Sequence, residues 1–197
     1  MLRISNTQVY GLEESCIASG YPMRTDLPHE FSDGVYFHFD KTPHYKRSCK
    51  LGNAQSNSGH ANFLTGIIVQ FDVTYPAYWS MQFQRYHFAQ FISSQSKMHK
   101  LAFMDLESGM NKYVSKQVIE YLTNLQNDYQ ANPTYENYMK LLSNCPMGLE
   151  LTARISTNYL QLKNIYNQRK MHKLKEDWGE FCSWVEQLPH FKELTGV

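Results

Sequence analysis

The chain has 197 residues, of which 42% are hydrophobic and 14% aromatic, and its formal net charge is +1. This length and composition suit one folded domain over residues 1–197 and argue against a disordered chain. The small net charge excludes a general attraction to nucleic acid or to acidic membranes, so any anion-binding site has to be local.

The four cysteines, Cys16, Cys49, Cys145 and Cys182, show no C-x-x-C spacing. We therefore expect reduced thiols rather than a zinc site or a redox motif. The N-terminal residues contain no apolar signal-peptide core, and no apolar run approaches the ~20 residues that span a bilayer. These features predict a soluble, cytoplasmic protein.

The first sixty residues are interrupted by glycine and proline, which predicts irregular structure. Residues 34–40, "GVYFHFD", are aromatic and predict a short strand. Residues 56–63 predict a loop in which Ser58 or Asn62 caps the next element. Residues 66–73, "GIIVQFDV", are β-branched and predict a second strand.

Pro76 stands where a helix would begin, and "AYWSMQFQRYHF" is predicted to continue that helix to residue 88. In such a helix Tyr78, Gln82 and Arg85 would share one face. The simplest interpretation of this face alone is an amphipathic helix with a solvated arginine.

The second half predicts helices over residues 114–130, 134–144, 149–169 and 175–187, with Thr134 as an N-cap. The first of them carries a predicted apolar stripe, formed by Val114, Val118, Tyr121, Leu122 and Leu125.

The predicted helix over residues 149–169 carries polar groups on two faces. One face holds Ile155, Asn158, Leu162, Ile165 and Arg169, and Asn164 lies about 120° away at ~100° per residue. A helix between its own core and a partner subunit would need both faces, so this pattern favours an oligomer. A core helix with polar edges is the alternative.

Several common catalytic sites are missing from the sequence. It has no dinucleotide or P-loop glycine motif, no G-x-S-x-G elbow and no histidine spacing typical of a metal site. Asp72 is the only carboxylate between residues 51 and 104. This composition suggests cations, amides and hydroxyls around an anion, with the demanding chemistry left to a cofactor.

Two segments resemble the flavin-dependent thymidylate synthase family. "QFQRYHFAQFISSQSKM" is similar to the family signature R-H-R, followed by seven residues and a serine, with Arg85 in the first position. Gln82 matches a family glutamine, and His60 a histidine in the preceding loop. "TNYLQLKNIYNQR", residues 157–169, resembles a helix further along the family sequence. The two segments occur in the family's order.

The resemblance implies an α+β fold, with an antiparallel sheet and a helix-rich C-terminal half, in a homotetramer with sites between subunits. It also implies FAD as cofactor, with methylenetetrahydrofolate and NADPH as co-substrates. The implied reaction adds a one-carbon unit and a hydride to C5 of a pyrimidine deoxynucleotide, converting dUMP to dTMP. Neither a protein nucleophile, nor a metal, nor a nucleic acid or membrane partner is implied.

Carried over residue by residue, the resemblance assigns two sets of binding residues. The nucleotide set contains Gln82, Arg85, Ser93, Gln95, Lys97 and Arg169. The flavin set contains His60, Asn62, Tyr86, His87, Asn158 and Asn164. In this assignment Arg85 is the buried or half-buried anchor of the phosphate, because a forked guanidinium suits an oxyanion.

The chain departs from the family pattern at several positions, as divergent phage-borne members do. Tyr86 and His87 replace the second and third residues of R-H-R, and Gln95 takes the place of the motif serine. Leu142 and Leu160 stand where the family has arginines. The cations that could compensate are Lys140, Lys163 and Arg154.

Three alternatives stay open on the sequence. The first is a related enzyme with another pyrimidine substrate, or one that hydroxymethylates. The second is a non-catalytic relative that binds nucleotide or only assembles. The third is an unrelated helical interaction protein. Flavin retained on the purified protein would favour an enzyme.

Overall fold

The computed structural model describes residues 2–25, 38–54 and 59–197. The chain forms two compact units, one made of Met1–Asn6 and Phe71–Ile155, the other of Thr7–Gln70 and Ser156–Val197. We call them the first and the second unit. The single domain over residues 1–197 stays a prediction.

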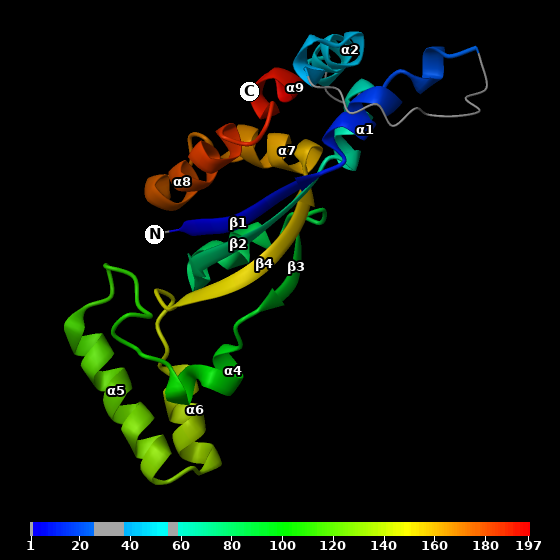
Figure 1. Ribbon diagram of the computed structural model, residues 1–197. Helices are drawn as coiled ribbons and strands as arrows, with labels where there is room; N and C mark the ends of the chain where they lie inside the picture. The colour runs from blue at the N-terminus through cyan, green and yellow to red at the C-terminus, as the bar shows by residue number, and fades with distance from the viewer. Residues whose placement is uncertain (1, 26–37, 55–58) are drawn as a thin grey trace. The chain divides into compact units, whose positions relative to one another are not determined.

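The fold contains a four-stranded antiparallel sheet in the order β1-β2-β4-β3 (Figure 1). This sheet and the many helices confirm the predicted α+β class. The strands are β1 (Arg3–Tyr10), β2 (Ile68–Pro76), β3 (Gln90–Ser94) and β4 (Glu150–Asn158).

Strand β2 confirms the strand predicted for residues 66–73, shifted slightly towards the C-terminus. Its side chains alternate between buried and half-buried positions, with Val69, Phe71, Val73 and Tyr75 on the buried side. One face of the strand therefore packs into a core while the other carries polar groups, as is typical of an antiparallel sheet.

The predicted helix over residues 149–169 is wrong in its first half. Residues 150–158 form strand β4, and helix α7 (Tyr159–Arg169) begins only afterwards. Along β4 Ala153, Ile155 and Thr157 are buried in alternate positions, a period of two that belongs to a strand. The two-faced helix does not exist, so the sequence argument for an oligomer loses its basis.

Most of the second half of the first unit is helical. Thr134 caps α6, because its Oγ1 accepts a hydrogen bond from the Asn137 backbone N–H, as predicted. The helical elements of this unit are α3 (Ala77–Phe83), α4 (Lys97–Lys100), a 3-10 turn (Leu101–Phe103), α5 (Lys116–Ala131) and α6 (Tyr135–Ser143).

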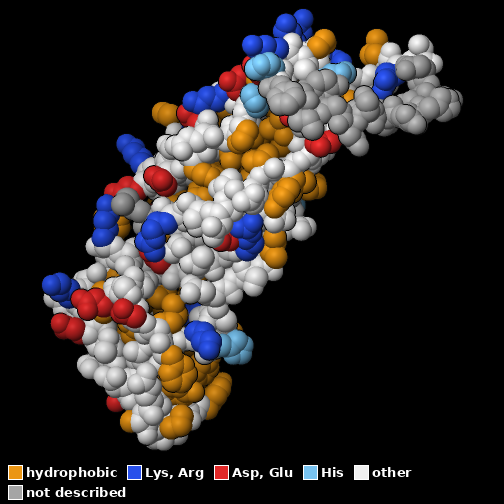
Figure 2. All heavy atoms as spheres, viewed as in Figure 1, with side chains coloured by type: hydrophobic (Ala, Val, Ile, Leu, Met, Phe, Trp, Pro, Cys, Tyr) orange, Lys and Arg blue, Asp and Glu red, His pale blue; other side chains and the backbone are white. Residues whose placement is uncertain are grey.

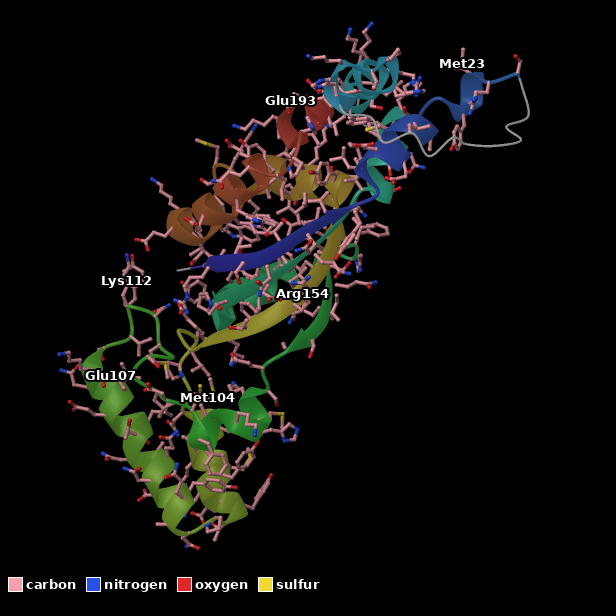
Figure 3. All side chains as sticks on the ribbon, viewed as in Figure 1. Met23, Met104, Glu107, Lys112, Arg154 and Glu193 are labelled. Atoms are coloured by element: carbon pink, nitrogen blue, oxygen red, sulfur yellow. The ribbon has the colours of Figure 1, made fainter. Side chains whose placement is uncertain are left out.

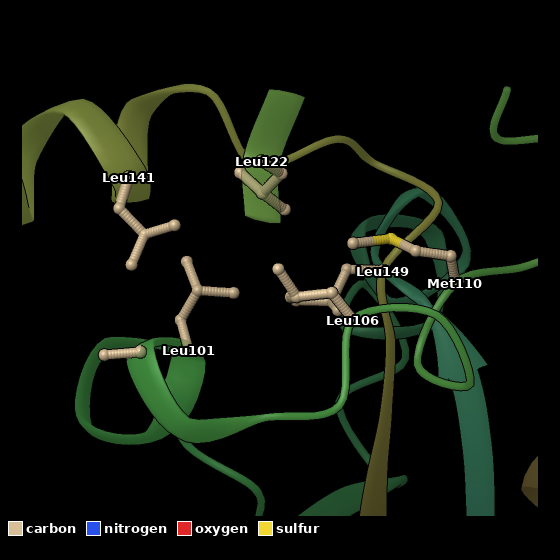
Figure 4. Close-up of a cluster of buried hydrophobic side chains, with 7 residues drawn as sticks. Leu101, Leu106, Met110, Leu122, Leu141 and Leu149 are labelled. Carbon is tan, nitrogen blue, oxygen red and sulfur yellow. The ribbon is translucent and has the colours of Figure 1, made fainter. Parts of the chain in front are cut away.

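Helices α5 and α6 pack around their own apolar cluster (Figure 4), whose centre includes Leu101, Leu122 and Leu141. The apolar stripe predicted for α5 is only partly right. Leu122 is fully buried, but Val118 and Tyr121 are exposed. The helix buries a narrower face than the sequence pattern indicated.

The second unit contains helices from both ends of the chain. Helix α8 confirms the helix predicted for residues 175–187. Its elements are α1 (Leu12–Ala18), a 3-10 turn (Tyr21–Met23), another (Phe39–Lys41), α2 (Pro43–Gly52), a third (His60–Gly66), α7, α8 (Lys175–Glu186) and α9 (Phe191–Thr195).

Three predictions for the N-terminal half have to be corrected. Residues 34–37 of the predicted strand and residues 56–58 of the predicted loop lie outside the described residues, as does Ser58. Phe39 and Asp40 belong to a 3-10 turn, and residues 60–63 begin another. The expected irregular start is also wrong, because β1, α1 and α2 occupy much of it.

Side-chain hydrogen bonds connect the helices and the strand residues of the second unit. The Trp184 Nε1–H donates to Thr7 Oγ1 at 3.0 Å. The Tyr166 hydroxyl donates to Glu186 Oε1 at 2.6 Å, and Lys192 pairs with the other oxygen of the same carboxylate. Among the helices that the structure describes, none is long and apolar enough to cross a membrane.

Candidate functional site

In the first unit, stacked aromatic rings fix the segment that carries the signature motif. Trp79 and Phe83 of α3 stack at a centroid distance of 4.6 Å, and both are fully buried. Phe91 of β3 meets Phe83 edge-on at 5.9 Å and Tyr75 at 5.8 Å. The turn between α3 and β3, residues 84–89, is thereby held at both ends.

Arg85 lies in that turn and not on a helix, because α3 ends at Phe83. Its backbone N–H donates to the Gln82 carbonyl at 3.4 Å, which keeps these two predicted residues next to each other. The Arg85 side chain is exposed. The expectation of a buried or half-buried anchor is therefore wrong, and burial supplies no argument for a bound anion there.

Tyr86, assigned to the flavin by the resemblance, is buried to 9% exposure. Its ring meets Phe83 edge-on at 6.0 Å, so it belongs to the aromatic core of the first unit. His87 is exposed. Only the third position of the signature triplet therefore presents a side chain that differs from the family and is open to a ligand.

Gln95 extends the sheet beyond the end of β3. Its backbone N–H donates to the Thr152 carbonyl, and its side-chain Oε1 accepts from the Thr152 N–H, both at 2.9 Å. The carboxamide thus takes the place of a backbone carbonyl. Sequence reasoning missed β3 and this role, because the run "QFISSQS" gives little alternation.

Two further predicted nucleotide residues flank Gln95. Ser93 is an exposed residue of β3, and Lys97 is the half-exposed first residue of α4. Ser96 Oγ accepts from the His99 backbone N–H at 3.3 Å and caps that short helix. The structure therefore keeps Ser93, Gln95 and Lys97 on one continuous segment.

The three cations considered as replacements are bound to other groups. Arg154 projects from β4 (Figure 3) and pairs with Asp72 at 3.1 Å. Lys140 pairs with Glu136 at 2.8 Å. Lys163 donates to the Gly52 carbonyl at 2.8 Å. Each has a partner within the protein, so none is a ready substitute for a missing arginine.

In the second unit, His60 and Asn62 line one pocket of about 610 Å³. The Asn62 backbone N–H donates to the Gly59 carbonyl, and its own carbonyl accepts from Thr65 Oγ1. Sequence reasoning missed the rest of the lining, which no motif marks. Other residues of the lining are Ser15, Ala18, Ser19, Pro22, Met23, Arg47, Leu51 and Phe63.

The remaining predicted residues of the second unit lie on α7. Asn158 is its N-cap, with Oδ1 accepting from the Gln161 N–H at 2.9 Å. Asn164 is exposed. The Arg169 guanidinium lies 4.6 Å from the centre of the buried Trp178 ring, a cation–π contact that orients it.

The thiols provide no activated nucleophile. Burial raises the pKa of Cys16 and of Cys182 to about 11, and it also raises the pKa of Cys49 and Cys145. Each thiol is therefore protonated at neutral pH. No group of three potential metal ligands occurs in the part of the chain that the structure describes.

Acidic and basic side chains are interspersed over the visible surface (Figure 2). On this face, binding of an anion therefore depends on individual residues. Gln82, Arg85, Tyr86, His87, Ser93, Gln95 and Lys97 belong to the first unit. His60, Asn62, Asn158, Asn164 and Arg169 belong to the second.

Comparison with known proteins identifies the fold. No family model and no curated protein sequence matches the chain. Two crystal structures of the flavin-dependent thymidylate synthase of Helicobacter pylori, both with FAD and dUMP, are similar to it. The first has a TM-score of 0.71 at 14% identity, covering 98% of this chain and 97% of that one. The second has a TM-score of 0.70 at 14% identity, covering 99% and 97%.

Proposed function

We propose that this protein is a divergent flavin-dependent thymidylate synthase, or a close variant that modifies a pyrimidine deoxynucleotide at C5. The observation that carries the proposal is a fold shared with such an enzyme over almost the full length of both chains. The two signature segments support it independently, since they occur in the family's order and on separate parts of the fold.

In this proposal the nucleotide is bound by forked and amide donors. Arg85 and Arg169 supply guanidinium groups to the phosphate, with Gln82, Ser93 and Lys97 around the nucleotide. Arg169 is already oriented by Trp178, so less of its side-chain entropy is lost on binding. Gln95 contributes by holding its segment to β4.

The residues of the second unit fit FAD. The pocket of His60 and Asn62 has apolar walls for a flat ring, and none of its described lining residues is a carboxylate that would repel phosphate. His60, Asn62 and Asn164 would hold the cofactor, and the assignment of His87 to the flavin rests on the resemblance alone. Once reduced by NADPH, the bound flavin would supply the hydride, and methylenetetrahydrofolate would supply the one-carbon unit.

A homotetramer belongs to the same proposal and rests on the resemblance alone, and a cytoplasmic location is proposed with it. Light scattering at micromolar concentration tests it. A strict monomer would contradict the tetramer and leave the fold unaffected.

A non-catalytic relative that binds nucleotide is the second candidate. The environments of three residues of the signature segment favour it. Arg85 is exposed, Tyr86 is buried in the core, and Gln95 is occupied by the backbone of β4. A protein that kept the fold after losing the reaction would show such changes.

The absorption spectrum of the purified protein separates the two candidates, together with a dUMP-to-dTMP assay containing methylenetetrahydrofolate and NADPH. The enzyme is expected to bind FAD and to form dTMP, and Arg169→Ala should weaken dUMP binding far more than Lys170→Ala. A protein that binds dUMP but neither FAD nor folate would be the non-catalytic relative.

A further inference from the structure

Arg47 is a half-buried cation of α2. It makes no ion pair with any residue that the structure describes. Its neighbours are instead neutral oxygens at the end of α1 and the imidazole of His44, whose Nδ1 lies 3.2 Å from Arg47 Nη2. Its Nε–H donates to Ser19 Oγ, and its Nη2 donates to the carbonyls of Cys16 and Ile17, all at 3.2 Å. A partly buried cation without a counter-charge is costly unless a ligand provides one.

The same contacts fix the guanidinium in one place. A Cβ on Gly20 would lie 2.5 Å from Arg47 Cζ, so an alanine at this position would displace the guanidinium. Nη1 makes no hydrogen bond to the described residues, which leaves its two N–H groups for a ligand. Arg47 therefore combines a fixed position with unused donors, as anion recognition requires.

Arg47 lines the pocket that also contains His60 and Asn62. The described polar residues that line the pocket provide hydroxyls, an amide, an imidazole and this guanidinium, and none of them is a carboxylate. Leu51 and Phe63 form apolar wall. Burial is the main cause that lowers the pKa of the adjacent His44, and the charges of Arg47 and Arg24 lower it further.

We propose that this pocket binds a small molecule in which a flat apolar body carries an oxyanion, and that Arg47 binds the oxyanion. The flat body would lie against Phe63 and Leu51, while Nη1 donates to the phosphate or carboxylate. If the proposed function holds, the source is either a phosphate of the flavin or a carboxylate of the folate. The contact between Arg47 and the anion requires neither identification.

Two dyes of the same shape test the contact. Anilinonaphthalene sulfonate carries an oxyanion, and N-phenyl-1-naphthylamine lacks it. Losing a charge-assisted hydrogen bond should weaken sulfonate binding about 10–100-fold in Arg47→Gln and leave the neutral dye within about twofold. Lys46→Gln, which removes an exposed charge from the same helix, should change neither dye by more than about twofold.

Two more variants keep the test decisive if Arg47→Gln folds poorly. Gly20→Ala retains the charge but displaces the guanidinium, and it should reproduce the selective loss of the sulfonate. Ala18→Phe fills the pocket and should abolish binding of both dyes. Equal weakening of the two dyes by Arg47→Gln, an equal effect of Lys46→Gln, or unchanged binding in Ala18→Phe would each overturn the proposal.

Displacement of the sulfonate dye by FAD or by folinic acid identifies the physiological source, with riboflavin as the flavin that lacks phosphate. Formation of dTMP by the unaltered protein is measured separately. A protein that forms dTMP but shows no dye contrast contradicts only the Arg47 assignment. A dye contrast in a protein without synthase activity contradicts only the proposed function.

Discussion

Asn158→Ala should destabilise the second unit by an amount set by one hydrogen bond. Asn158 has the extended backbone of an N-cap, and its Oδ1 accepts the Gln161 N–H at 2.9 Å. Alanine leaves that donor of α7 without its cap, which costs about 1 kcal/mol, in a range of roughly 0.5–2. For a chain of this size, each kcal/mol lowers Tm by about 2–4 °C.

Thermal unfolding followed by circular dichroism measures this shift. Asn164→Ala is the matched control, because Asn164 is an exposed residue of the same helix, and its effect should stay within about 0.5 kcal/mol. Equal shifts in the two variants, or an unchanged Tm in Asn158→Ala, would refute the capping role.

Asn158→Asp separates the cap from the proposed flavin contact. Aspartate keeps an acceptor oxygen, and its charge interacts favourably with a helix N-terminus, so stability should be largely retained. If Asn158 also donates its amide N–H to FAD, the aspartate variant will be stable but will bind FAD more weakly. Unchanged FAD binding would restrict Asn158 to its structural role.

Three further outcomes follow from packing and charge. Leu122→Ala should lower the urea-derived unfolding free energy by about 2–5 kcal/mol, and Val118→Ala on the exposed side of α5 by far less. Similar losses in the two variants would mean that Val118 is part of the buried face of α5, as the sequence pattern predicted. Hydrogen bonding to Asn6 and Arg154 lowers the pKa of Asp72. The difference in unfolding free energy between wild type and Asp72→Asn should therefore be present at pH 7 and shrink as the pH falls below about 4. A difference that stays constant with pH would contradict this pairing. Gly52→Ala should lower Tm, because its Cβ would collide with a backbone carbonyl of α9. Gly179→Ala has open space within α8 and should raise stability by about 0.5–1 kcal/mol. A stabilised Gly52→Ala together with a destabilised Gly179→Ala would be inconsistent with these contacts.

The elements predicted correctly are those whose local pattern agrees with their tertiary role. Half-buried and buried residues alternate along β2 from Ile68 to Tyr75. Thr134 at the start of α6 makes the capping bond that its sequence position suggests. Helix α8 follows a simple apolar periodicity. In these elements local preference and burial point to the same structure.

Strand β4 was mistaken for helix because no breaker separates it from α7. Asn158 is both the last residue of the strand and the N-cap of the helix, so neither glycine nor proline marks the boundary. Leu151, Ala153 and Arg154 also have fair helix propensity, which the pairing with β2 overrides. A period of two over residues 150–158 was the signal that could have corrected the prediction.

The candidate site was only partly accessible to sequence reasoning. His60 and Asn62 share a pocket, as their common assignment to one ligand expects. Arg47 was missed because its partners are carbonyls of α1, about thirty residues earlier in the chain. The resemblance assigned Gln95 to the ligand because it takes the place of the motif serine, and nothing in a linear sequence indicates that its side chain completes a strand.

The strand order has a consequence for how the chain folds. Strands β2 and β4 are neighbours, although residues 77–149 separate them in sequence. Closing so long a loop is entropically slow, whereas the cluster of α5 and α6 is built entirely from residues 101–151. We expect this helical hairpin to form early, even on the ribosome, and the sheet to assemble only after β4 has been synthesised. Until then the apolar side of β2 is exposed, so the nascent chain should depend on chaperones more than its modest size suggests.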